Sequence, residues 1–151
     1  MIAIRGATPD DVSDLVAAYQ WLFDPPGRLP PQWDPARATD ILGRVLAGPR
    51  STVLVADEGP AQLVGFCTVY LDIESARFGQ RAWVEDLAVH PDHRSLGVGK
   101  ALLDAAKGWA EMRGATHLEL DSGDGRVAAH RFYDRESPSW QSRSFGWELR
   151  H

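Results

Sequence analysis

The chain has 151 residues, of which 44% are hydrophobic and 25% charged, and its net charge is −5. This length and composition suit one globular domain. The negative net charge excludes a general nucleic-acid-binding surface, which needs a basic footprint. No apolar run approaches ~20 residues, which excludes a membrane span. The single cysteine, Cys67, excludes an internal disulfide, and no apolar signal region marks the N-terminus, so a cytoplasmic location is expected.

The first third of the sequence predicts two helices separated by a loop. Residues 8–23 carry apolar side chains at helical spacing, with Pro9 in the first turn, which it tolerates. Residues 24–35 hold five prolines and one glycine, a composition that breaks regular structure. The second helix is expected to begin at Pro35, capped by Asp34. Loops of this length in compact domains often cover a site.

The rest of the chain alternates strand-like and helix-like patterns. Strands are expected at 51–57, 63–73, 82–89, 116–122 and 144–150, and helices at 97–113 and 125–136. The longer helix has Val98, Leu102, Trp109 and Met112 on one face. This order predicts a mixed α+β fold, with a mostly antiparallel central sheet flanked by helices, in a single domain over residues 1–151.

The segment RSLGVGK, residues 94–100, joins a strand to a helix through two glycines. Backbone N–H groups at a helix N-terminus attract phosphate, and glycine lets the ligand approach. A P-loop is excluded, because Arg94 and Ala101 occupy positions that need glycine and Ser or Thr. A dinucleotide fingerprint fits Gly97 and Gly99 but has Leu102 in its third place. A nucleotide-binding oxidoreductase is therefore one alternative, which stabilisation by NAD(H) and not by CoA would reveal.

A third phosphate-binding pattern, Arg/Gln-x-x-Gly-x-Gly/Ala, is matched in full by residues 94–99. Through this pattern the sequence resembles the GNAT superfamily of acyl-CoA-dependent N-acetyltransferases. AHRFYDRE, residues 129–136, resembles the family's fourth helix, and the order and spacing of both blocks agree over roughly residues 50–136. The resemblance implies the GNAT fold, acetyl-CoA as co-substrate, and an acetyl transfer to a primary amine by direct attack in a ternary complex.

The resemblance also implies which residues bind the donor. The pantetheine arm is expected to pair with the backbone of Leu87, Ala88 and Val89. The pyrophosphate is expected on the turn and the start of the following helix, with charge-assisted contacts from its cationic side chains. These residues are Arg94, Ser95, Leu96, Gly97, Val98, Gly99 and Lys100. Arg126, where relatives often have Asn, is a candidate contact to the donor's ribose and 3′-phosphate.

Two catalytic residues are expected from the resemblance. Tyr133 matches the tyrosine that protonates the departing thiolate in many relatives, and Glu85 matches the glutamate that accepts the amine's proton, commonly through water. Alternation along the strand places Glu85 and Asp86 on opposite faces, so either acid could face the cleft. No metal is expected, although His90, Asp92 and His93 lie close in sequence.

The C-terminal region departs from the family pattern. Relatives usually follow the tyrosine helix with Gly-Phe, whereas this chain has Ser137 and Pro138. The acceptor stays open between an amine of a small molecule and one of a protein, and a homodimer is the family's common state. A rival hypothesis from another class is an acyl-CoA-binding sensor or interaction module of the same fold that transfers nothing; Tyr133 and Glu85 favour the enzyme.

Overall fold

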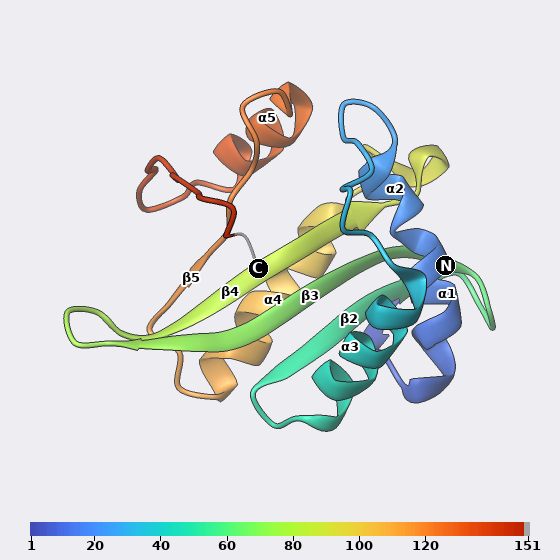
Figure 1. Ribbon diagram of the computed structural model, residues 1–151, viewed down its shortest axis with the longest axis horizontal. Helices are drawn as coiled ribbons and strands as arrows, with labels where there is room; N and C mark the ends of the chain where they lie inside the picture. Colours follow the sequence, from blue (N-terminus) through green and yellow to red (C-terminus); the bar gives the residue numbers. More distant parts are fainter. Residues whose placement is uncertain (150–151) are drawn as a thin grey trace. The chain divides into compact units, whose positions relative to one another are not determined.

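A five-stranded sheet with the strand order β1-β2-β3-β4-β5 runs through residues Met1–Leu120 of the computed structural model (Figure 1). The structure describes residues 1–149 and contains a second compact unit that begins at Asp121. The strands are β1 (Ala3–Gly6), β2 (Ser51–Asp57), β3 (Leu63–Ser75), β4 (Gly79–Val89) and β5 (His117–Glu119). All neighbours pair antiparallel except β4 and β5, which are parallel. The predicted mixed α+β fold is confirmed.

The helices lie close to where the sequence predicts them. They are α1 (Val12–Ala18), α2 (Gln20–Phe23), α3 (Pro35–Ala47), α4 (Val98–Met112) and α5 (Val127–Arg135), with short 3-10 turns at Pro9–Asp11 and Pro91–His93. The helix expected over 8–23 is divided at Tyr19, which caps α1 and precedes α2. Asp34 caps α3 as expected, because its Oδ1 accepts the N–H of Ala36 at 3.0 Å.

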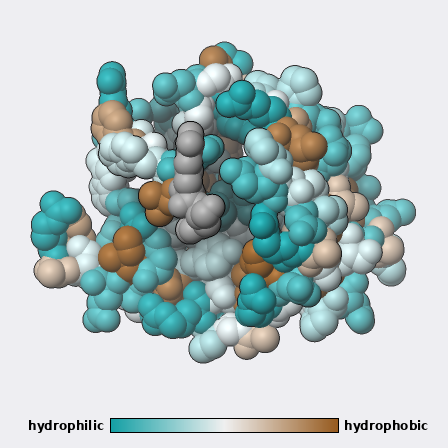
Figure 2. All heavy atoms as spheres, in the orientation of Figure 1, coloured by the Kyte–Doolittle hydropathy of each residue, from teal (hydrophilic) through white to brown (hydrophobic). Residues whose placement is uncertain are grey.

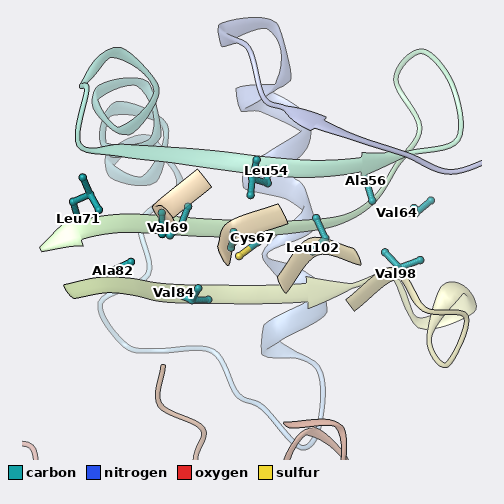
Figure 3. Packing of buried hydrophobic residues seen from close by; sticks show 12 residues of the cluster. Leu54, Ala56, Val64, Cys67, Val69, Leu71, Ala82, Val84, Val98 and Leu102 are labelled. Carbon is teal, nitrogen blue, oxygen red and sulfur yellow. The ribbon is translucent and has the colours of Figure 1, made fainter. Parts of the chain in front are cut away.

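Hydrophobic side chains cover both faces of the sheet. On one face, Val98 and Leu102 of α4 pack against a cluster that includes Cys67 and Val84 (Figure 3). On the other face, α1 and α3 pack against Phe66 and its neighbours. The long central strands β3 and β4 are thus held between helices on both sides, which fixes the position of the loops at their ends.

Further details differ from the sequence-based expectations. Strand β1 was missed, because four residues are too few to show a periodic pattern. Met112 is 85% exposed, because it is the last residue of α4 and extends beyond the sheet. The strand expected over 144–150 is wrong for residues 144–149, where the structure assigns none. Its alternating Phe145, Trp147 and Leu149 are 74%, 82% and 80% exposed, since alternation supplies a strand pattern but no pairing partner. Arg150 and His151 lie outside the described residues.

The surface of the molecule is mostly hydrophilic on the face drawn in Figure 2, where hydrophobic residues form small separate groups. Within residues 1–149, every helix is too short or too polar to traverse a lipid bilayer.

Candidate active site

The turn between β4 and α4 has a backbone conformation that requires glycine. Gly97 has φ +85°, in the left-handed region, and a Cβ added there would meet no atom within 4 Å. Its conformation, rather than lack of space, therefore selects glycine. Ser95 is also left-handed, at φ 63°, although it carries a side chain. Leu96 between them is 67% exposed, so this turn is open to solvent.

Helix α4 begins directly after this turn. Val98 is buried against the sheet and anchors the helix, while Gly99 and Lys100 continue its first turn. The first N–H groups of a helix have no carbonyl partner within the helix, and they carry a partial positive charge. The turn and the start of α4 therefore present backbone donors, and the binding of phosphate there stays a prediction.

The two cationic side chains of the segment have protein partners. The guanidinium of Arg94 donates from Nε to the carbonyl of Val89 at 3.1 Å and from Nη2 to that of Trp21 at 3.3 Å. Lys100 pairs with Asp104 at 3.0 Å, one turn along α4. An exposed pair of this spacing contributes only about 0.3–0.5 kcal/mol, so an anionic ligand can compete for the ammonium group. Arg94 instead ties the end of β4 to α2.

One edge of β4 is unpaired near this turn. Strand β5 pairs with β4 only at Arg81–Trp83, whereas β3 continues to pair with β4 as far as Val89. Within the part of the chain that the structure describes, residues 84–89 therefore have no strand partner on the β5 side. Figure 1 shows β5 diverging from β4. An unpaired edge presents backbone donors and acceptors to any extended chain that can reach it.

The hydrogen bonds at the end of β4 show which residues face this edge. The N–H of His90 donates to the carbonyl of Val64 on β3 at 2.8 Å. Because backbone groups alternate along a strand, Ala88 also turns toward β3, and Leu87 and Val89 turn toward the unpaired edge. Of the three predicted donor-binding residues of β4, two thus direct backbone groups outward.

Glu85 occupies a β-bulge. Thr68 pairs with Asp86 and Val69 pairs with Val84, so Glu85 is the extra residue of β4. Its side chain is exposed, and its Oε1 accepts the indole N–H of Trp83 at 2.9 Å. The bulge changes the alternation assumed from sequence, because two consecutive acidic residues now face a single position of β3.

Asp86 lies in a more enclosed environment than Glu85. Its Oδ2 accepts hydrogen bonds from the Tyr19 hydroxyl at 2.6 Å and from Thr68 Oγ1 at 3.1 Å. Thr68 Oγ1 also accepts the N–H of Asp86 at 3.0 Å. Burial raises the pKa of the Asp86 carboxyl, the hydrogen bond from Tyr19 opposes this, and the negative charge of Glu85 raises it further.

Aromatic rings surround the Tyr19 end of this network. The ring of Tyr19 stacks on Trp33 at 5.3 Å and lies 4.9 Å from Phe66. Trp33 belongs to the proline-rich loop and meets Phe23 edge-on at 4.8 Å. Burial raises the pKa of Tyr19, and so does the charge of Asp86, so its hydroxyl stays protonated and donates. The loop that the sequence predicted to cover a site thus reaches the residue that holds Asp86.

Tyr133 and Arg126 belong to the second unit. Tyr133 lies on α5, half-buried, with its ring 5.1 Å from that of Phe132. Arg126 immediately precedes α5. Their expected roles with the donor stay predictions.

Two other features of the sequence have structural partners. His90 Nδ1 accepts the N–H of Asp92 at 3.0 Å, and His93 Nε2 lies 2.8 Å from Glu58. Among residues 1–149, no three His, Cys, Asp or Glu side chains gather in a way that could hold a metal ion. Cys67 is buried, which raises the pKa of its thiol to about 12.

Sequence reasoning missed Tyr19 and Thr68. Tyr19 and Asp86 are separated by 67 residues and Thr68 and Asp86 by 18, and no local motif relates such positions. The only sequence signal was composition: a proline-rich loop with a tryptophan, next to a helix that ends in aromatic residues.

Known proteins resemble this chain over most of its length. The sequence model of the Acetyltransferase (GNAT) family matches residues 15–137. An aminoglycoside N(6')-acetyltransferase type 1 of Stenotrophomonas maltophilia is 31% identical over 130 residues, which cover 84% of this chain and 79% of that protein. An uncharacterised N-acetyltransferase of Bacillus subtilis, YhdJ, is 46% identical over 55 residues, 36% of this chain, and the match spans only 39% of that protein's length.

The fold also matches solved structures. The aminoglycoside N-acetyltransferase AAC(6')-Iy, crystallised with CoA, superposes with a TM-score of 0.82 at 15% identity, covering 100% of this chain and 96% of that one. At this identity the likeness concerns the fold alone. With the family match over residues 15–137 and the glycine turn beside an unpaired strand edge, the chain belongs to the GNAT family of acetyltransferases.

Proposed function

We propose that this protein is an N-acetyltransferase that moves the acetyl group of acetyl-CoA to a primary amine of a small molecule. The observation that carries the proposal is the meeting of two backbone features: the unpaired edge of β4 and the glycine turn that opens α4. The first suits an extended amide-containing arm and the second suits a pyrophosphate. Both belong to one stretch of chain from residue 84 to residue 100.

The residues present fit the donor. Leu87 offers outward backbone groups to the amides of the pantetheine arm, and Val89 offers its N–H, because its carbonyl already accepts from Arg94 Nε. The turn at Gly97 is exposed, and the space where a Cβ would project is open, so phosphate oxygens can approach the N–H groups of the first turn. Lys100 adds a positive charge there. Ser95, Leu96, Val98 and Gly99 contribute through their backbone, and Arg94 orders the turn through its own bonds.

The proposed reaction is a direct transfer. The acceptor nitrogen attacks the thioester carbonyl carbon, the new C–N bond forms, and the C–S bond breaks with its electrons leaving on sulfur. A carboxylate of β4 accepts the amine's proton: Glu85 is the candidate that the resemblance gives, and Asp86 is the alternative left open. Tyr133 is the proposed proton donor to the thiolate. Cys67 is unsuited to carry the acetyl group, because it is buried and its raised pKa keeps it protonated.

The class of acceptor is proposed from relatives and from the site. A relative 31% identical is named as an aminoglycoside N(6')-acetyltransferase, whose name describes acetylation of a cationic small molecule. Two adjacent carboxylates and a neighbouring group of aromatic rings suit a cationic amine. The homodimer expected from the family remains a prediction for this chain.

Thermal unfolding with acetyl-CoA, CoA or NADH tests the donor. A ligand at a hundred times its Kd adds about 2.7 kcal/mol of stability, which shifts the midpoint clearly. We expect stabilisation by acetyl-CoA and CoA, and none by NADH. Gly97→Glu should lose the effect, because it strains the left-handed backbone and places a negative charge where phosphate is expected. Gly108→Glu, in an open position of the same helix, is the matched control and should keep it.

Release of CoA thiol in the presence of a panel of primary amines then tests the transfer. Turnover with a cationic amine supports the enzyme. Stabilisation by acetyl-CoA without turnover on any amine would favour the acyl-CoA-binding module. No stabilisation at saturating acetyl-CoA would contradict both the acetyltransferase and the acyl-CoA-binding module.

A further inference from the structure

The Tyr19 hydroxyl makes a hydrogen bond that the packing of its ring does not explain. The ring of Tyr19 is fully accounted for by its contacts with Phe66 and Trp33, which a phenylalanine could also make. Its hydroxyl donates to Asp86 Oδ2 at 2.6 Å, a short bond of the charge-assisted kind. The contact joins the break between α1 and α2 to β4, next to the unpaired edge.

The hydrogen bonds of Asp86 are unequally shared between its two oxygens. Oδ2 accepts from both Tyr19 and Thr68, whereas Oδ1 accepts no hydrogen bond within the described residues. A carboxylate held by one oxygen has the lone pairs of the other available for a ligand. Asp86 is half-buried, so this oxygen is neither fully hydrated nor sealed in the core.

We propose that Tyr19 is a positioning residue that holds Asp86 by Oδ2 and directs its Oδ1 to the acceptor amine, so that Asp86 rather than Glu85 accepts the amine's proton. This rests on the proposed acetyl transfer. One proton passes from the acceptor's ammonium to Asp86 Oδ1, and the neutral nitrogen keeps the lone pair with which it attacks. The second proton leaves the nitrogen as the amide forms and replaces the one that Tyr133 gives to the departing thiolate. Asp86 returns the proton to solvent after transfer.

The surroundings of Asp86 suit this task. The titratable groups around Asp86 are Tyr19 from the α1–α2 break and Glu85 from β4, which act on its pKa. Tyr70 and Cys67 of β3 also lie nearby, and the charge of Asp86 raises their pKa values. Burial raises the pKa of Asp86, which strengthens the carboxylate as a base, and the hydrogen bond from Tyr19 opposes this rise. Glu85 lies exposed at the bulge, bonded to an indole.

Carbon-13 NMR of the full-length protein labelled at the aspartate carboxyl carbon tests the proposal without knowledge of the acceptor. Asp86→Asn identifies the signal of Asp86 by its loss. In Tyr19→Phe we expect the midpoint of the Asp86 titration to move to higher pH, because the lost hydrogen bond had stabilised the ionised form. Tyr70→Phe is the matched control: it changes a half-buried tyrosine on β3 that is not hydrogen-bonded to Asp86, and the midpoint should stay.

The same variants are then assayed with the amine found by thiol release. The acid limb of kcat/KM against pH should move to higher pH in Tyr19→Phe, with KM for acetyl-CoA unchanged, and Asp86→Asn should remove the limb. A Tyr19→Phe titration midpoint that stays or falls would overturn the positioning role. Loss of the limb in Glu85→Gln with its retention in Asp86→Asn would assign the proton to Glu85. Failure of the proposed function is seen separately, as absence of acetyl-CoA stabilisation in the unaltered protein.

Discussion

The proposed donor side and the proposed acceptor side of the site are built in different ways. The donor side consists of consecutive residues, from the free edge of β4 through Gly97 into α4, and it acts through backbone groups. The acceptor side joins side chains from three distant segments, Tyr19, Thr68 and Asp86. A backbone site tolerates many side chains and depends on conformation and close approach, whereas a side-chain network depends on each functional group. Substitutions should therefore affect the two sides differently.

The largest effect is expected where α4 approaches the sheet beneath the donor turn. A Cβ added to Gly65 would lie 2.9 Å from Leu102 Cδ1, 3.0 Å from Val98 Cγ1 and 3.2 Å from the carbonyl of Ala88. Gly65→Ala should lower the free energy of unfolding by about 1–3 kcal/mol, because the core is overpacked, and should weaken acetyl-CoA binding by displacing the first turn of α4. Urea unfolding and calorimetric titration measure the two effects.

Gly43→Ala is the control for this change. Gly43 lies inside α3, where an added Cβ meets no atom within 4 Å, so alanine should raise stability by up to about 1 kcal/mol through its helix propensity. If Gly65→Ala has the same stability and the same affinity for acetyl-CoA as the unaltered protein, the close approach of α4 to Gly65 does not determine the geometry of the donor side.

On the acceptor side, Thr68→Val should be destabilising without touching the donor. Thr68 is fully buried, and its hydroxyl both donates to Asp86 and accepts the N–H of Asp86. Valine of the same shape removes the side-chain partner of the Asp86 N–H and one of the two donors to Asp86 Oδ2, which keeps its bond from Tyr19, and this loss costs about 1–3 kcal/mol. Thr68→Ser, which keeps the hydroxyl, should recover most of the loss in urea unfolding. If Thr68→Val loses acetyl-CoA affinity to the same extent as it loses stability, the donor side and the acceptor side are not independent.

Asp86→Asn should make the protein more stable at neutral pH. The folded-state pKa of Asp86 is raised, so the folded protein binds this proton more tightly than the unfolded chain does. The associated stability is present below the unfolded pKa of about 3.9 and is lost as pH rises through the folded pKa. Each unit of elevation corresponds to about 1.4 kcal/mol. Unfolding measured from pH 4 to pH 8 should show the advantage of asparagine growing with pH.

Asp11→Asn should change the stability at neutral pH in the opposite direction. The hydrogen bond from Arg5, at 2.8 Å, lowers the pKa of Asp11 to about 2, so its stabilisation is present above about pH 3.9 and lost toward pH 2. Solvent around Arg5 limits its contribution to about 1 kcal/mol. Asp11→Asn should therefore destabilise at pH 7. If both variants change the free energy of unfolding at neutral pH in the same direction, burial of the ionised Asp86 carboxylate does not destabilise the protein.

The smallest effect is expected at the loop. Trp33 stacks on Tyr19 and contacts Phe23, and an aromatic pair contributes about 0.5–1.5 kcal/mol beyond its buried area. Trp33→Leu should raise KM for the amine about twofold to tenfold and leave KM for acetyl-CoA unchanged. Trp33→Phe should lie close to the unaltered protein. A change in KM for acetyl-CoA instead would move Trp33 to the donor side.

The sequence by itself determined the fold class, most helices and strands, and the glycine turn of the segment proposed to bind the donor. Each depends on residues that are close along the chain: apolar spacing for α3 and α4, the Asp34 cap, and the glycine spacing of residues 94–99. Strand β1 and residues 144–149 were not predicted correctly, because a strand exists only where a neighbour pairs with it.

Only the tertiary structure decided the acceptor side. The bulge at Glu85 comes from how β3 and β4 pair, and it changes which acids face β3 together. The enclosure of Asp86 and its bond to Tyr19 arise when α1 packs on the sheet, across 67 residues of sequence. The proton affinity of a carboxylate depends on burial and on neighbouring charges, which residue order along the chain does not specify, whereas the conformation of a glycine turn is encoded where the glycine stands.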